Sequence, residues 1–344
     1  MEFSANGKIE QHIGCQLVTW FGKNRRILPW RTHSSIYYRL VSEFMLQQTQ
    51  VSTVTPYFER WIKQFPSITV LAEASETEVL KAWEGLGYYA RAKNLHETAK
   101  IIIKQENFTF PKTLKEWQRL PGIGDYTAHA LASIAQNQHV AAVDGNVIRV
   151  LCRINGIQKI FENKNQAVKY IKNIATLYIP HGKSAHYNEA VMEFGALICR
   201  AQNPFCDRCP ITKYCHSFQE KLDCSRIPQF RKTIYIKKNL QRVFICNNSV
   251  ILLKQTNTKR LYHIFELPLF EDISQIISMR KIAEINRAIV HERITEIILE
   301  PEYLPENLQN LANDYLILLP IQELKNITLS GPHRKWLDKK ITAI

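Results

Sequence analysis

The chain has 344 residues, of which 45% are hydrophobic, and its 45 Lys and Arg residues exceed its 31 Asp and Glu residues by 14 charges. This length predicts two domains with full hydrophobic cores, and the positive charge favours a polyanionic partner, either a nucleic acid or an anionic membrane face. No run of about 18 apolar residues occurs, so no membrane-spanning helix is expected, and the first residues do not have the pattern of a signal peptide.

Up to about residue 216 the apolar residues recur with the period of a helix. One such stripe comprises Tyr37, Leu40, Val41, Phe44 and Met45, and another comprises Val147, Val150, Leu151 and Ile154. Short turn signals separate the helical segments: Leu28-Pro29, Gly85-Leu86-Gly87, Pro121-Gly122-Ile123-Gly124 and Pro180-His181-Gly182. The sequence therefore predicts a helical domain over residues 1–216.

Beyond residue 216 the pattern changes. Residues 217–240 are basic and poor in periodic apolar positions, which predicts a linker. Two apolar runs on either side of Asn247-Asn248, residues 243–246 and 250–253, predict a hairpin. Residues 294–299 and 315–319 predict further strands. We therefore expect a small α+β domain over residues 241–344.

Four of the eight cysteines lie close together with the spacing C-x6-C-x2-C-x5-C: Cys199, Cys206, Cys209 and Cys215. Four thiolates on one short segment suit a soft metal, and free buried cysteines would rarely gather so closely. Structural zinc sites usually show two close pairs and a longer spacer, whereas this compact, uneven spacing suits the wrapping of a 4Fe–4S cube. The other cysteines are scattered and are expected to be packing residues: Cys15, Cys152, Cys224 and Cys246.

The cysteine spacing resembles that of the endonuclease III superfamily of DNA glycosylases. This resemblance implies that the four cysteines hold an iron–sulfur cluster with a structural or DNA-linked role. The segment from Leu120 to Ala128 also has the form of a helix–hairpin–helix turn, in which Gly122 and Gly124 let the backbone approach a phosphate closely. Taken alone this segment could be a plain helix–helix turn, but the cysteine motif downstream favours DNA binding.

Glu43 lies off the apolar stripe of its predicted helix, and a helical glutamate is usually a solvated charge. The segment around it, residues 42–51, nevertheless resembles the signature of adenine DNA glycosylases of the MutY type, as do Leu28-Pro29-Trp30-Arg31 and residues 85–91. The resemblance extends over about residues 17–216. It implies that Glu43 is the general acid that protonates adenine at N7, a task for a carboxyl group with a raised pKa.

Asp144 suits the N-cap of the helix that follows it. The resemblance adds a second role, in which its carboxylate stabilises the oxocarbenium ion left on the sugar, while Asn146 and Tyr126 help to hold Asp144 and the attacking water. Related lyases carry a lysine at the position of Tyr126, and a tyrosine cannot form their Schiff base. We therefore expect a monofunctional glycosylase.

The resemblance also implies contacts with the substrate. Arg31 is expected to line the adenine pocket, and Gln48 and Tyr88 are expected to fill the space left by the extracted base. The alternatives are a surface glutamine and a core tyrosine. The remaining expected DNA contacts are Thr49, Leu86, Gly122, Gly124 and Thr295.

Residues 241–344 resemble, more faintly, the Nudix-like lesion-reading domain of the same family, through Phe265-Glu266-Leu267-Pro268. The Nudix hydrolase signature is absent, since Gly331 is the only glycine after residue 195, so we expect this domain to bind rather than catalyse. The family reads oxidised guanine with a Phe-Ser-His loop before a strand. The expected counterpart is Ile294-Thr295-Glu296, which keeps only the hydroxyl.

These features indicate base excision repair by hydrolysis of the N-glycosidic bond of adenine opposite 8-oxoguanine or guanine in double-stranded DNA. The protein is expected to carry a 4Fe–4S cluster and to be cytoplasmic and associated with the nucleoid. The alternatives are a bifunctional or thymine-directed glycosylase of the same superfamily, and a non-catalytic DNA-binding module. The pair of Glu43 and Asp144 argues against the last of these.

Overall fold

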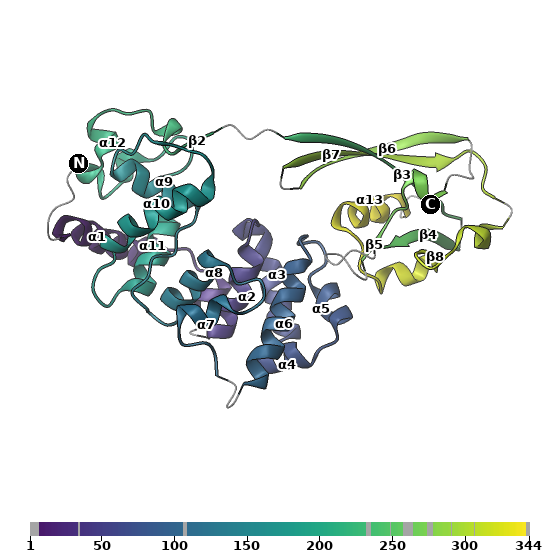
Figure 1. Cartoon of the computed structure of the whole chain (residues 1–344), viewed down its shortest axis with the longest axis horizontal. Helices are drawn as coiled ribbons and strands as arrows, with labels where there is room; N and C mark the ends of the chain where they lie inside the picture. Colours follow the sequence, from purple (N-terminus) through teal and green to yellow (C-terminus); the bar gives the residue numbers. More distant parts are fainter. Residues whose placement is uncertain are drawn as a thin grey trace. The chain divides into compact units, whose positions relative to one another are not determined.

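The computed structural model describes residues 7–33, 35–105, 109–231, 235–247, 249–256, 264–273, 278–289, 291–305 and 307–341. The chain divides into two compact units (Figure 1). The first unit comprises Met1–Ile62, Ser67–Thr69 and Glu97–Lys232, and the second comprises Lys63–Pro66, Val70–His96 and Thr233–Ile344. Within the described ranges, no helix is long and apolar enough to cross a membrane.

The chain is helical up to residue 219, as the apolar periodicity predicts. The helices are α1 (Lys8–Asn24), α2 (Ile36–Leu46), α3 (Val51–Gln64), α4 (Ile68–Glu73), α5 (Glu76–Ala82), α6 (Ala90–Lys104), α7 (Leu114–Gln118), α8 (Asp125–Ala130), α9 (Gly145–Ile154), α10 (Lys164–Leu177), α11 (Ser184–Leu197) and α12 (His216–Gln219). Side chains that accept a backbone N–H bond cap several of them at the N-terminus, namely Ser35, Ser75, Thr113, Asp144 and Asn163.

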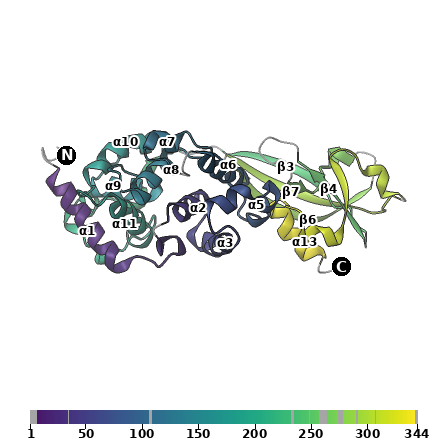
Figure 2. The same ribbon diagram turned by 90° about the horizontal axis from the view of Figure 1, so that it is seen from below.

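The core of the first unit lies among α1, α9, α10 and α11, and α1 runs beside α11 in both views (Figures 1 and 2). The predicted stripes of α2 and α9 are buried in full. Gly14 allows α1 to pack closely, because a Cβ atom there would lie 1.9 Å from the carbonyl oxygen of Tyr178. These helices carry the side chains of the candidate site.

The segment predicted as a linker over residues 217–240 differs from that expectation in the structure. Its first part packs on the helices of the first unit: Ile227 is buried, and β2 (Gln229–Phe230) pairs in parallel with β1 (Ile160–Phe161). Its last part is already the strand β3 (Ile236–Val243). These contacts cannot be predicted from the basic, weakly periodic segment itself, because the strands that pair with it, β1 and β7 (Glu292–Pro301), are distant in the sequence.

The second unit contains two three-stranded sheets, so the predicted α+β region is confirmed. In one sheet, β7 (Glu292–Pro301) lies between β3, which is parallel to it, and β6 (Met279–Ile289), which is antiparallel. In the other sheet, β4 (Val250–Gln255) lies between β5 (Phe265–Glu266) and β8 (Leu316–Pro320), all antiparallel. Helix α13 (Gly331–Ile341) packs on the first of two apolar clusters, to which β4 contributes Ile251 and Leu253, while Leu252 joins the second.

The predicted hairpin around Asn247 is present in a shortened form. Strand β3 ends at Val243, and only Cys246 bridges to Ile251 across the turn. Most of β3 pairs instead with β7, whose own sequence is a long alternation of buried and partly exposed residues. The segment Ile294-Thr295-Glu296 therefore lies inside β7 and not in a loop.

Candidate functional site

A cavity of about 520 Å³ opens in the first unit, between α2, the start of α3, α8, the start of α9, and α11. It brings together six of the residues predicted from the sequence: Arg31, Glu43, Thr49, Tyr126, Asp144 and Asn146. These residues come from five separate segments, so their convergence is a property of the fold.

Glu43 is 9% exposed and lies on the cavity wall. Burial raises the pKa of its carboxyl group to about 7. The charge of Arg39 lowers this pKa, those of Asp144 and Glu189 raise it, and a hydrogen bond with Tyr126 lowers it. A carboxyl group in this state is still partly protonated near neutral pH, as a general acid must be.

Asp144 is the N-cap of α9 and accepts from the backbone N–H of Val147 at 2.8 Å and from Nδ2 of Asn146 at 2.9 Å. Burial raises the pKa of Asp144, and these two hydrogen bonds oppose the shift. Asn146 Oδ1 in turn accepts from Nη2 of Arg149 at 2.8 Å, which fixes its amide group. Asn146 thus contacts the carboxylate of Asp144 directly.

Helix α11 supplies the opposite wall of the cavity and two buried carboxylates that sequence reasoning missed. Glu189 accepts from Nε of Arg31 at 2.9 Å and from Nη1 of Arg39 at 2.8 Å, and Glu193 accepts from Nη2 of Arg26 at 2.7 Å. Burial raises the pKa of Glu193, but Arg26 and Arg31 lower it to about 2. The signal was two acidic residues four apart in a segment, residues 189–197, that is otherwise apolar.

The expected DNA contacts differ in their exposure. Gln48 is exposed just after α2 with φ of 58°, and Tyr88 is 44% exposed with φ of 47°. Both occupy the left-handed region that such residues rarely adopt, which costs about 1–3 kcal/mol and is typical of functional segments. Leu86, by contrast, is 6% exposed, so its side chain offers little surface to a ligand.

The predicted hairpin connects α7 to α8. Gly122 has φ of 73°, the left-handed conformation that glycine adopts without strain, while Gly124 is extended at φ of −79° and precedes α8. The carbonyl of Gly122 accepts from Nε2 of Gln47 at 3.4 Å. The tight turn that the two glycines predict is therefore present.

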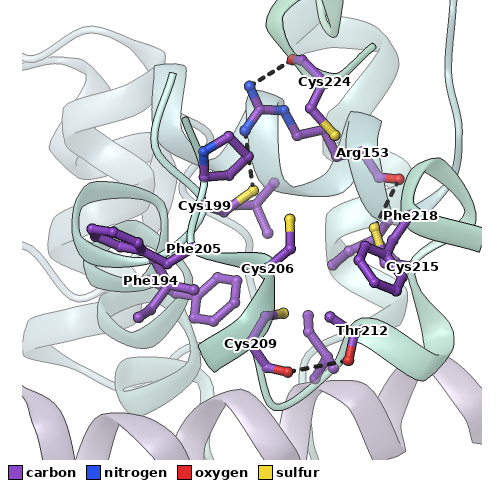
Figure 3. A pocket seen from close by; sticks show the side chains of 15 residues that line it. Arg153, Phe194, Cys199, Phe205, Cys206, Cys209, Thr212, Cys215, Phe218 and Cys224 are labelled. Atoms are coloured by element: carbon purple, nitrogen blue, oxygen red, sulfur yellow. Dashed lines mark hydrogen bonds between the residues drawn. The ribbon is translucent and has the colours of Figure 1, made fainter. Parts of the chain in front are cut away.

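The four motif cysteines line a second cavity of the first unit, together with apolar side chains of α9, α11 and the following loop. Figure 3 shows their sulfur atoms around one space, with the sulfur of Cys224 beside them. Burial raises the pKa of Cys209 to about 12 and that of Cys215 to about 11. In the part of the chain that the structure describes, no group of three or more His, Cys, Asp or Glu side chains is arranged to hold a metal ion.

Cys224 was expected to be an unrelated packing residue, and this expectation was wrong, because its thiol shares the cavity of the motif cysteines. Buried Arg153 connects these segments. Its guanidinium donates to Sγ of Cys199 at 3.4 Å, to the carbonyl of Cys224 at 2.7 Å and to that of Ile227 at 3.1 Å (Figure 3). The cysteine cavity is thus defined by Cys199, Cys206, Cys209, Cys215 and Cys224.

In the second unit, Ile294-Thr295-Glu296, the expected counterpart of the lesion-reading loop, lies within β7, and Glu296 is buried. Glu296 is 0% exposed and accepts from Nε of Arg242 at 3.1 Å and Nη2 of Arg287 at 2.9 Å. The neighbouring Thr295 donates to Oδ1 of Asn286 at 2.8 Å across the β6–β7 pair. The alternation of the strand turns Glu296 into the core between Ile294 and Ile298.

The chain is similar in sequence to known DNA repair proteins. The HhH-GPD superfamily of base excision DNA repair proteins matches residues 41–176. An adenine DNA glycosylase of Buchnera aphidicola subsp. Schizaphis graminum is 34% identical over 331 residues, which cover 95% of this chain and 92% of that relative. The chain belongs to the adenine DNA glycosylase family. A mouse adenine DNA glycosylase is 39% identical over 212 residues, or 59% of this chain, and the match spans 41% of the mouse protein's length.

Solved structures agree with the helical fold. A thermostable thymine-DNA glycosylase has a TM-score of 0.56 and 26% identity, covering 63% of this chain and all of that one. A non-covalent complex of endonuclease III with DNA has a TM-score of 0.52 and 21% identity, covering 62% of this chain and 97% of that one. The second likeness concerns the fold alone.

Proposed function

We propose that this chain removes adenine from DNA by hydrolysing its N-glycosidic bond, and that the adenine lies opposite 8-oxoguanine or guanine. The observation that carries the proposal is a buried carboxyl group, Glu43, whose pKa is about 7, on the same cavity as the capped carboxylate of Asp144. Family membership supports the choice of adenine as the base. Double-stranded DNA is the proposed partner.

The two carboxyl groups divide the reaction between them. Glu43 donates its proton to N7 of adenine, so that the base leaves as a neutral molecule. Asp144, in its carboxylate form, stabilises the positive charge that develops on the sugar. Asn146 and the N–H of Val147 keep its carboxylate in place. Arg31 lines the pocket that receives the base, with its own charge balanced by Glu189 and Glu193.

The proposed activity is monofunctional. A lyase step requires an amine that attacks the sugar, and the residue at the corresponding position of the cavity wall is Tyr126. We expect no covalent product when borohydride is added during the reaction with a mispaired duplex. A borohydride-trapped protein–DNA adduct would instead support the bifunctional alternative.

The cysteine cavity is the proposed site of a 4Fe–4S cluster. The donor set fits: thiols surround one apolar cavity, and the N–H of Arg153 points at the sulfur of Cys199, as suits a thiolate ligand. Cys199, Cys206, Cys209 and Cys215 would hold the cluster. Anaerobically purified protein should contain about four irons per chain, and stoichiometric zinc in their place would contradict this assignment.

The second unit is proposed to be a Nudix-like lesion reader. The family pattern places its reading loop before a strand, and here β7 begins at Glu292, directly after the exposed turn residue His291. An imidazole N–H can donate to O8 of the lesion, an acceptor that guanine lacks. We expect His291→Ala to lower the ratio of excision rates opposite 8-oxoguanine and guanine. Thr295→Ala, measured in the same assay, tests the hydroxyl that the sequence predicts to contact the lesion.

A single-turnover assay tests the main proposal. Duplexes with adenine opposite 8-oxoguanine, guanine, cytosine and thymine are compared at one salt concentration, because phosphate contacts make binding salt-dependent. Excision opposite 8-oxoguanine and guanine, with little opposite cytosine or thymine, is expected. A duplex with thymine opposite guanine tests the thymine-directed alternative, and binding without any excision would support the non-catalytic one.

A further inference from the structure

The cysteine cavity holds one thiol more than a 4Fe–4S cluster binds, since such a cluster takes four cysteines. The additional thiol belongs to Cys224, which follows the motif and lies outside its spacing. Figure 3 shows its sulfur facing the same space as those of Cys199 and Cys206. A spare thiol beside four proposed ligands requires an explanation.

The backbone around Cys224 is firmly held. Cys224 begins a short helical turn that is capped by Asp223, whose carboxylate accepts from the N–H of Ser225 at 2.9 Å. Arg153 donates to the carbonyl of Cys224, and the buried Ile227 anchors the far end of the turn. Its placement at the cavity wall is therefore a defined part of the fold.

Cys206 is a motif cysteine in an exposed turn. It lies in a turn whose next residues, Asp207 and Arg208, are 74% and 72% exposed in their side chains. The sulfur of Cys199, in contrast, accepts from buried Arg153. The thiols of Cys206 and Cys224 line the same cavity.

We propose that Cys224 is a reserve ligand that binds iron when Cys206 leaves the cluster. The inference rests on the proposed cofactor. In the exchange, Cys224 gives up its thiol proton and forms the bond to iron, while the bond to Cys206 breaks and that thiolate takes up a proton. No electron is transferred. The effect is a cluster that survives the loss of its ligand in this exposed turn.

The test uses full-length protein purified without oxygen. Cys206→Ala, Cys224→Ala and the double variant are compared with a matched control, Cys206→Ala/Cys246→Ala, which removes a cysteine outside the cavity. Alanine is chosen because a serine oxygen can itself bind iron. We expect both single variants and the control to keep about four irons per chain, and the double variant to lose most of them.

Native alkylation with iodoacetamide identifies the ligand directly. In the wild type Cys224 should be modified, and in Cys206→Ala it should become protected. A Cys206→Ala protein as poor in iron as the double variant, or one whose Cys224 stays reactive, would overturn the inference. Wild-type protein without iron would overturn the proposed cofactor as well, and so the two failures are distinguishable.

A second measurement does not depend on the folding of Cys206→Ala. Wild-type and Cys224→Ala proteins, both loaded with cluster, are treated with ferricyanide, and the loss of visible absorbance is followed. We expect the Cys224→Ala cluster to bleach several-fold faster, because no replacement ligand is available. Equal rates would contradict the reserve role.

Discussion

Glu43 in the first unit and Glu296 in the second are both buried carboxyl groups, with 9% and 0% of their surface exposed. Burial raises the pKa of Glu43 to about 7. Burial acts in the same direction on Glu296, but its close contact with His333 and the charges of His333, Arg287 and Arg242 lower its pKa to about 2. The depth of burial therefore does not decide the protonation state of a buried acid; its partners do.

The partners of the two residues explain this difference. Arg39 is the cation whose charge lowers the pKa of Glu43. Its guanidinium, however, forms an ion pair with Glu189. Glu296 receives two arginines, and Nε2 of His333 lies 3.4 Å from it. The N–H of Leu267 donates to Nδ1 of His333, so that Nε2 is the ring nitrogen that faces Glu296. Glu43 can therefore hold a proton near neutral pH, whereas Glu296 is ionised there.

The largest expected effect is on catalysis. Glu43→Gln removes the proton donor but keeps the shape of the side chain, so DNA binding should persist while excision falls by about 10²–10⁴-fold. Single-turnover rates and a gel-shift titration measure the two effects. A variant with a near-normal rate would show that Glu43 is not the general acid.

The second prediction concerns stability. Glu296→Gln leaves buried Arg242 and half-buried Arg287 without their shared carboxylate, and breaking a buried pair in this way costs about 3–5 kcal/mol in the free energy of unfolding. Urea unfolding at pH 7 measures the loss. Glu284→Gln is the matched control, because its pair with Lys281 is exposed and should contribute nothing measurable. Equal stabilities of the two variants would contradict the role of Glu296.

The third prediction separates the two acids by pH. Excision should decline above pH 7, by about tenfold per pH unit, as Glu43 loses its proton. For stability, the raised pKa of Glu43 gives a contribution present below 4.5 and lost as the pH rises through about 7. The lowered pKa of Glu296 gives a contribution present above 4.5 and lost as the pH falls toward about 2.

Two subtractions measure these contributions. The difference in unfolding free energy between wild type and Glu43→Gln should change between pH 4.5 and 7, and that between wild type and Glu296→Gln should change only below 4.5. If both differences changed over the same pH range, the contrast between the two glutamates would be lost.

The smallest expected effect comes from Tyr126→Phe. The hydrogen bond of Tyr126 lowers the pKa of Glu43, so its removal should move the alkaline decline in excision to higher pH. The shift should be less than about one pH unit, because a single hydrogen bond contributes about 0.5–1.5 kcal/mol and one unit corresponds to about 1.4 kcal/mol. An unchanged or lower midpoint would show that Tyr126 does not act on Glu43.

Local patterns in the sequence predict the helices of the first unit well. The stripes of α2 and α9 are buried as expected, and Asp144 caps α9, because period and capping are properties of neighbouring residues. The wall formed by α11 was missed, since the arginines that Glu189 and Glu193 bind are more than 100 residues away. The sequence motifs identify Glu43 and Asp144 on the cavity wall, whereas the contribution of α11 to that wall is known only from the packing of the helices.

The second unit shows what a faint resemblance can hide. The alternation Ile294, Glu296, Ile298 is that of a strand with one buried face, and it places Glu296 in the core. Residues that alternate in this way belong in a strand, so they do not form a loop like that of the family. The partners of Glu296 are Arg242 in β3, Arg287 in β6 and His333 in α13. They are distant in the sequence, so no local pattern predicts these contacts.

Helix α9 carries Asp144 at its first turn and Arg149 and Arg153 farther along, where they bond the carbonyls of Cys199 and Arg200. The direction in which each side chain leaves α9 therefore positions both Asp144 in the candidate active site and the two arginines at the cysteine loop. A single residue inserted after Val147 would rotate the rest of the helix by about 100°. Both guanidiniums would then turn away from the cysteine loop while Asp144 kept its place, so length changes in this helix should be tolerated far less than substitutions on its surface.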